Sequence, residues 1–131
     1  MKKVLIFFAC FFGLILILML SVVIKIYNEV DAFDKTPVNI SEVEDGVYEG
    51  YSETTLVKVQ VRVTVSNGKI DNIEILKHEC GKGMPANVIV DEMAEKNTVD
   101  VDAVSGATVS SEVIKDAVRN ALRSQPVLSL E

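Results

Sequence analysis

Residues 102–108, with the sequence DAVSGAT, lie directly before a segment whose apolar residues recur with helical spacing. The first amide groups of a helix have no intrahelical partner and carry partial positive charge, so they favour an anionic phosphate. Gly106 and Ala107 allow a ligand to approach the backbone closely, and Thr108 presents a hydroxyl at the mouth of the helix. We therefore predict that this junction holds a phosphate ester.

The helix that follows this junction is predicted to begin near Ser110. Ser110 or Ser111 would accept a hydrogen bond from an amide of the first turn and so cap the helix. Its apolar stripe, which we expect to pack on the domain, consists of Val113, Ile114, Ala117, Val118, Ala121 and Leu122. Ser, Gly and Thr before a helix are also typical of an ordinary N-terminal turn, so SGAT alone favours a turn without a ligand.

The full string DAVSGAT followed by VSS resembles the flavinylation motif of the bacterial FMN-binding domain family, in which Asp, two variable residues, Ser or Thr, Gly, Ala and Thr occur in that order. The resemblance implies that a separate flavin transferase esterifies the Thr108 hydroxyl to the phosphate of FMN. It also implies that Ser105, Gly106 and Ala107 form the turn around the phosphate. Asp102 matches the acidic position of the motif, where it would serve the modification reaction or hold the loop.

The resemblance extends from Asp45 to Leu122, which is most of the chain after the apolar segment. His78 occupies the place of a polar neighbour of the flavin, which could donate a hydrogen bond or influence proton uptake. An ordinary histidine at the end of a strand is an equally good interpretation of His78. The chain has ECGK at 79–82 where larger members carry an ETPG-type loop, so contacts to the flavin ring transfer less securely than the attachment site.

An uncharged apolar segment, Val4 to Ile24, predicts a transmembrane anchor within residues 1–26. Its 21 residues would rise about 32 Å as a helix, enough to cross a hydrocarbon core. A cleaved signal peptide has a shorter apolar core and a small-x-small site, and a lipoprotein cysteine at Cys10 lacks a suitable upstream sequence. Lys2 and Lys3 favour a cytoplasmic N-terminus and an extracytoplasmic domain.

All 19 acidic residues and ten of the 13 basic ones follow position 27, which gives this part of the chain a net charge of −9. Such a charge argues against nucleic acid and against adhesion to anionic lipid headgroups. Cys10 and Cys80 fall in different parts of the chain, so no disulfide is predicted. The sequence contains no dinucleotide-binding glycine fingerprint, no haem-attachment CxxCH and too few cysteines for an iron–sulfur cluster, so no metal site is predicted.

The strongest secondary-structure signal is the alternation of valines at 57, 59, 61, 63 and 65 with polar residues, which predicts a strand. A shorter strand is expected at 47–51, and Asn67-Gly68 predicts a hairpin turn into a return strand that begins at Ile70. A bulge near residues 71–72 is needed so that Ile73 meets Val63 and Ile75 meets Val61 on one buried face.

A loop at 81–85 is expected to precede a helix that includes Val88, Ile89, Met93 and Ala94, with Pro85 suited to its first turn and Asn97 closing it. The predicted fold class is α+β, a small antiparallel sheet with two helices packed on one face, preceded by a single transmembrane helix. The predicted organisation is an anchor at 1–26, a tether at 27–44, an FMN-binding domain at 45–124 and a C-terminal tail at 125–131.

With FMN attached, the chain is expected to carry electrons between partners rather than to act as an enzyme, because no motif marks a site for a soluble substrate. The expected partners are the flavin transferase and a membrane redox partner, such as a quinone-linked dehydrogenase or another reductase. Two alternatives remain open. The chain could be an anchored binding or sensor module that holds no flavin, or an accessory subunit of a membrane redox complex that carries no electrons.

Overall fold

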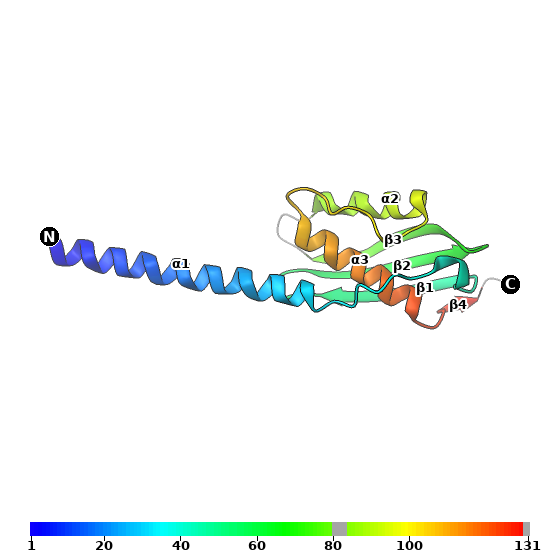
Figure 1. The fold of residues 1–131 in the computed structure, drawn as a ribbon, viewed down its shortest axis with the longest axis horizontal. Coiled ribbons are helices and arrows are strands. Elements are labelled where there is room, and N and C mark those ends of the chain that lie inside the picture. Colours follow the sequence, from blue (N-terminus) through cyan, green and yellow to red (C-terminus); the bar gives the residue numbers. More distant parts are fainter. Residues whose placement is uncertain (80–83, 130–131) are drawn as a thin grey trace.

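The computed structural model describes residues 1–79 and 84–129 (Figure 1). The elements follow in the order α1 (Lys2–Asp31), η1 (Ile40–Glu42), β1 (Gly46–Glu53), β2 (Lys58–Ser66), β3 (Lys69–Glu79), η2 (Met84–Val88), α2 (Ile89–Lys96), α3 (Thr108–Arg123) and β4 (Leu128–Ser129). The strands form one antiparallel sheet in the order β3-β2-β1-β4. Helix α2 packs on β3 and α3 packs on β1 and β2, which confirms the predicted α+β fold.

Helix α1 projects away from the sheet as a single long rod (Figure 1). Its apolar part has a mean hydropathy of 3.0 over 18 residues, and none of that stretch is buried by the rest of the chain. An exposed apolar surface of this size is unfavourable in water and marks a membrane or protein contact. The helix therefore has the length and composition of a membrane anchor or a signal sequence.

The segment after the apolar run differs from the irregular tether predicted for residues 27–44. Helix α1 continues without a break to Asp31, and Ile26 and Val30 are buried against the domain. The Glu29 carboxylate accepts hydrogen bonds from the backbone N and Oγ1 of Thr55, each 2.8 Å long. A polar and acidic composition with Pro37 favours a tether here, but composition does not reveal that Ile26 and Val30, one helical turn apart, have a surface to cover.

The predicted alternation in β2 is confirmed, because Val59, Val61, Val63 and Val65 are fully buried beneath the helices. Asn67 and Gly68 form the two-residue turn into β3, with φ values of 53° and 72°. Positive φ at both central positions is the geometry of a type I′ turn, whose twist matches the flanking strands.

The register of β3 confirms the predicted bulge. Val65 pairs with Ile70 but Thr64 pairs with Asn72, so the ladder skips Asp71. Ile73 then lies opposite Val63, and Ile75 lies opposite Val61, as the burial pattern requires. A second irregularity, which the sequence analysis did not predict, passes over Leu76 between the pairs Val61–Ile75 and Gln60–Lys77. The skip leaves Leu76 at the surface, 36% exposed.

Asn97 ends α2 as predicted and also joins this helix to the β2–β3 turn. It adopts the left-handed conformation, with φ 53° and ψ 44°. Its Oδ1 accepts a hydrogen bond from the backbone N of Ile70 at 2.8 Å, and its Nδ2 donates to the carbonyl of Gly68 at 3.3 Å. The first turn before α2, which contains Pro85, is the 3-10 helix η2 rather than α-helix.

Asn97→Ala is expected to lower the free energy of unfolding by about 2 kcal/mol, because it leaves the partly buried Ile70 amide without its acceptor and places a Cβ-bearing residue at positive φ. Urea unfolding followed by circular dichroism measures the change. Asn97→Gly is the matched control, because glycine keeps the backbone conformation while losing the same two hydrogen bonds. An alanine variant as stable as the wild type would show that the turn does not depend on this side chain.

Candidate functional site

Helix α3 begins at Thr108, two residues before the predicted start at Ser110. Ala107 occupies the N-cap position with φ −134° and ψ 40°, and no side chain caps the helix there. The prediction that Ser110 or Ser111 caps the helix is wrong, because both serines lie within the first turn and are buried. The preceding chain already turns into the helix at Gly106, so the α-helical conformation starts earlier than the apolar stripe alone indicates.

The turn before α3 is closed by a hydrogen bond of 2.9 Å from the Ala107 amide to the Val104 carbonyl. Gly106 occupies the third position of this turn with φ 80°, a conformation that glycine adopts without steric cost. Among the residues that the structure describes, none apart from its two chain neighbours has a heavy atom within 4 Å of a Cβ placed on Gly106. The backbone conformation, rather than packing against the described residues, therefore requires glycine at this position.

Thr108 lies at the first position of α3 and is exposed. The first intrahelical hydrogen bond of α3 runs from the Ser111 amide to the Ala107 carbonyl at 2.9 Å. The amides of Thr108, Val109 and Ser110 therefore precede the hydrogen-bond ladder and carry the positive end of the helix dipole. The first turn of α3 contains no acidic residue that would oppose an anion. An exposed hydroxyl beside unpaired amides suits a phosphate ester, so these residues fit FMN attached at Thr108.

Ser111 holds the turn against the helix. Its Oγ accepts a hydrogen bond of 2.9 Å from the Val104 amide and donates one of 2.8 Å to the Ala107 carbonyl. The hydroxyl therefore connects the first residue of the turn to the last one, and the Ser111 side chain is fully buried. The sequence analysis missed this role. The available signal was a serine four residues after a possible N-cap, the spacing at which a hydroxyl bonds back to the preceding turn.

Ser111→Ala is expected to lower the free energy of unfolding by about 1 to 2 kcal/mol, because the Val104 amide loses its acceptor in a partly buried position. The turn should also become less ordered, so a smaller fraction of the protein should acquire FMN from a flavin transferase. Urea unfolding and intact-protein mass spectrometry measure the two effects. Ser110→Ala is the matched control, since the neighbouring Ser110 is also buried but its hydroxyl has no hydrogen-bond partner among the described residues. Equal losses in both variants would remove the special role of Ser111.

Asp102 is exposed and lies near the end of α2. The pKa of Lys96 is raised chiefly by its hydrogen bond and charge interaction with Glu92, and the Asp102 carboxylate contributes to the same shift. Within the part of the chain that the structure describes, Asp102 makes no hydrogen bond or ion pair. Ser111 rather than Asp102 therefore holds the turn, which leaves a role in the modification reaction as the remaining hypothesis for Asp102.

His78 lies at the end of β3 and is half-buried. Its Nδ1 is 2.5 Å from Oδ1 of Asn87, a residue of η2, and because an amide oxygen only accepts, Nδ1 carries the proton. Among the described residues, Nε2 is buried without a hydrogen-bond partner. Since η2 also packs against α3, His78 is connected through η2 to the helix that follows the Gly106 turn. Of the loop predicted at 81–85, residues 81–83 lie outside the described residues, and Met84 and Pro85 belong to η2.

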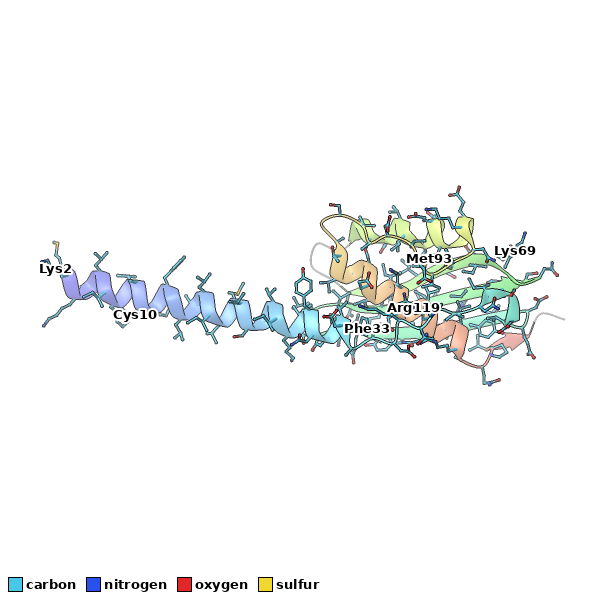
Figure 2. The ribbon with its side chains drawn as sticks, in the orientation of Figure 1. Lys2, Cys10, Phe33, Lys69, Met93 and Arg119 are labelled. Carbon is cyan, nitrogen blue, oxygen red and sulfur yellow. The ribbon has the colours of Figure 1, made fainter. Side chains whose placement is uncertain are left out.

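Arg119 restrains the segment that leads into the turn. This residue of α3 is only 3% exposed, and its Nη2 lies 3.5 Å from Oδ1 of Asp100 (Figure 2). Asp100 precedes Asp102 by two residues, so the ion pair fixes the start of the DAVSGAT segment on the middle of α3. Arg119 lies outside the predicted apolar stripe of this helix, so helical periodicity places it on the solvated face. Asp100 lies beside that face, which helical periodicity does not reveal. The pKa of Asp34 is lowered chiefly by hydrogen bonds from Thr36, and the positive charge of Arg119 contributes to the same shift.

Comparison with known proteins identifies the same region of the chain. The model of the FMN-binding domain family matches residues 50–123, which run from β1 to the end of α3 and include the turn and Thr108. A protein described as uncharacterized from Treponema pallidum (strain Nichols) is 32% identical over 91 residues, covering 63% of this chain and 24% of that protein. The chain thus spans about a quarter of the length of this relative. With more than half of its residues matched by the family model, the chain belongs to the FMN-binding domain family.

Proposed function

We propose that this protein is a membrane-anchored electron carrier whose FMN is esterified to the hydroxyl of Thr108. The observation that carries the proposal is the position of Thr108, an exposed hydroxyl at the first residue of α3, directly after a turn whose Gly106 has no described residue within 4 Å of an added Cβ. Family membership supports the cofactor, and the exposed hydroxyl supports its covalent attachment.

Attachment requires a separate flavin transferase that supplies an activated flavin nucleotide. Thr108 Oγ1 forms the new bond to phosphorus as a phosphoanhydride bond of the donor breaks. The departing phosphate takes the electron pair of that bond, and the hydroxyl proton passes to a base of the transferase or to solvent. The Thr108, Val109 and Ser110 amides would then stabilise the phosphate diester that remains.

The remaining residues of the site keep this geometry. Ser111 fastens the turn to α3, and Arg119 fastens the approaching segment through Asp100. Bound FMN supplies reversible electron transfer. A covalent ester lets a small domain retain its cofactor without enclosing it in a large pocket, so the flavin can stay accessible to partners. For this reason we assign the chain a carrier role with no substrate site of its own.

The proposal also assigns α1 as an uncleaved anchor with a cytoplasmic N-terminus. The length and hydropathy of α1 support an anchor, and Lys2 and Lys3 support the orientation. The domain would then lie outside the cytoplasm, together with the flavin transferase. Its redox partner would be a quinone-linked dehydrogenase or another reductase of the same membrane.

Coexpression with a flavin transferase tests the proposal. Intact-protein mass spectrometry should show a gain equal to FMN minus water, and peptide mapping should locate the added mass on Thr108. The purified yellow protein should bleach with dithionite and recover its colour on exposure to an oxidant. A chain that gains no mass, although the transferase modifies a second known substrate in the same cells, would favour a binding module instead.

A further inference from the structure

Helix α3 runs antiparallel to β1, which determines where Thr108 lies in the domain. Asp116 Oδ2 accepts a hydrogen bond of 2.5 Å from Ser52 Oγ near the end of β1, whereas Ala121 lies against Gly50, earlier in the strand. Thr108 precedes Asp116 by eight residues, so it lies about 12 Å further along the helix axis. It is therefore found at the end of the sheet where residues 54–57 connect β1 to β2 (Figure 1).

The same end of the domain receives α1. Glu29 accepts both of its hydrogen bonds from Thr55, a residue of the 54–57 loop, and the Ile26 and Val30 side chains are buried beside it. Ile24, the last residue of the apolar run, precedes Glu29 by five residues, a rise of about 8 Å. When α1 spans a membrane, the Thr108 end of the domain therefore faces the membrane surface. We call it the membrane-facing end, defined by Thr108, residues 54–57 and the C-terminal turn of α1.

A second set of contacts fastens the chain after α1 to the domain. The Arg123 guanidinium donates to the carbonyls of Asp34 and Thr36, at 3.2 and 2.6 Å, and pairs with the Asp34 carboxylate at 3.2 Å. Together with the Glu29 contacts, these bonds attach the chain to the domain both before and after Ala32. The net charge of −9 after position 27 gives anionic lipids no means of holding the domain, so its orientation depends on these contacts.

An apolar side chain is displayed at the membrane-facing end. Leu56, next to the Thr55 that binds Glu29, is 61% exposed. A single exposed leucine is common on protein surfaces, but its position here places an apolar group toward the membrane rather than toward bulk water.

We propose that the membrane-facing end is the surface on which the flavin exchanges electrons, and that the partner is a redox protein embedded in the same membrane. The inference rests on the proposed function and adds the surface of the domain at which electrons are exchanged. Glu29 and Arg123 act as positioning residues, which keep the attachment site turned toward the membrane. A water-soluble partner would have to enter the space between the domain and the membrane to reach the same site.

The orientation can be tested without any flavin, because the chain contains no tryptophan. Full-length Ser105→Trp places a fluorophore in the turn at the membrane-facing end. Lys69→Trp places one at the start of β3, at the other end of the sheet (Figure 2). The nine residues of β2 separate these two ends of the sheet by about 30 Å. In phosphatidylcholine vesicles that contain brominated lipid, the fluorescence of the Ser105→Trp protein should be quenched several-fold more than that of the Lys69→Trp protein. Equal quenching, or stronger quenching at Lys69→Trp, would overturn the proposed orientation.

The exchange surface is tested with flavin-loaded Glu29→Ala in native membranes. Its flavin should be reduced by dithionite at the wild-type rate but by the membrane-embedded donor several-fold more slowly. Asp31→Ala is the matched control, because Asp31 pairs only with Lys35, at 3.6 Å, among the described residues. The inference would be overturned if Glu29→Ala exchanged electrons with the membrane donor as fast as the wild-type protein does. It would also be overturned if the soluble fraction reduced the wild-type protein faster than membranes do. A wild-type chain without covalent flavin would count against the proposed function alone, since the tryptophan experiment stands without it.

Discussion

Thr108→Ala is expected to abolish covalent FMN attachment while the domain stays folded. The substitution removes the only oxygen of this side chain, and Thr108 is exposed, so little packing is lost. Alanine also tolerates the first position of a helix, where no intrahelical hydrogen bond is disrupted. After coexpression with a flavin transferase, intact-protein mass spectrometry should show no added FMN, and the thermal midpoint by circular dichroism should stay within a few degrees of the wild type.

Two controls make this result specific to the hydroxyl. Thr108→Ser retains an oxygen at the same position and should still acquire covalent flavin. Thr98→Ala removes a hydroxyl from the same connecting segment, where Oγ1 accepts a hydrogen bond from the Asp100 amide, and should leave attachment intact. Covalent flavin on Thr108→Ala would move the attachment site elsewhere and contradict the proposed function.

Gly50→Ala is expected to be the most destabilising single-methyl change in the sheet. A Cβ at this position would lie 2.0 Å from the Ala117 carbonyl oxygen, 2.5 Å from the Ala121 amide and 2.8 Å from the Ala121 Cβ. All three are atoms of α3 that cannot rotate away, so the helix would have to move off β1. Overpacking of this kind costs about 3 kcal/mol or more. That cost is a large part of the about 4 to 12 kcal/mol expected for a domain of roughly 80 residues.

Because α3 carries Thr108, displacement of the helix should also reduce the fraction of protein that acquires FMN. Urea unfolding measures the stability change, and mass spectrometry measures attachment in the same preparation. Gly106→Ala is the matched control for the stability change alone, because among the described residues a Cβ there meets nothing within 4 Å and only the positive φ opposes it. It should cost about 1 kcal/mol. A Gly50→Ala variant no less stable than Gly106→Ala would show that α3 does not pack on β1 as closely as described.

The core of the sheet could be predicted from the sequence because its pattern is local. The valines of β2 recur at every second residue, which matches the pleat of a strand, and the Asn67-Gly68 turn connects β2 to β3 in a hairpin. The bulge at Asp71 could be inferred because burial of Ile73 and Ile75 requires it. The bulge at Leu76 could not be inferred in this way, because Ile75 and Leu76 are both apolar and the sequence does not show which of them faces the core.

The end of α1 and the start of α3 could not be predicted from the sequence. Composition after Ile24 becomes polar and acidic, yet the helix continues because Ile26 and Val30 have a surface to cover. In α3 the apolar stripe begins at Val113, but the helix starts five residues earlier, where the Gly106 turn directs the chain. Both boundaries depend on contacts outside the element concerned, which a periodic pattern does not contain.

The sequence by itself determined the fold class, the apolar helix, the β2–β3 hairpin and the motif that contains Thr108, because each follows from residues close together in the chain. Only the tertiary structure decided what surrounds the motif. Ser111 fastens the turn, Arg119 lies buried against Asp100, and Glu29 connects α1 to Thr55. The Arg119 and Glu29 contacts join segments that are distant in sequence, and the Ser111 contacts depend on the turn that precedes α3, so a periodic pattern contains none of them.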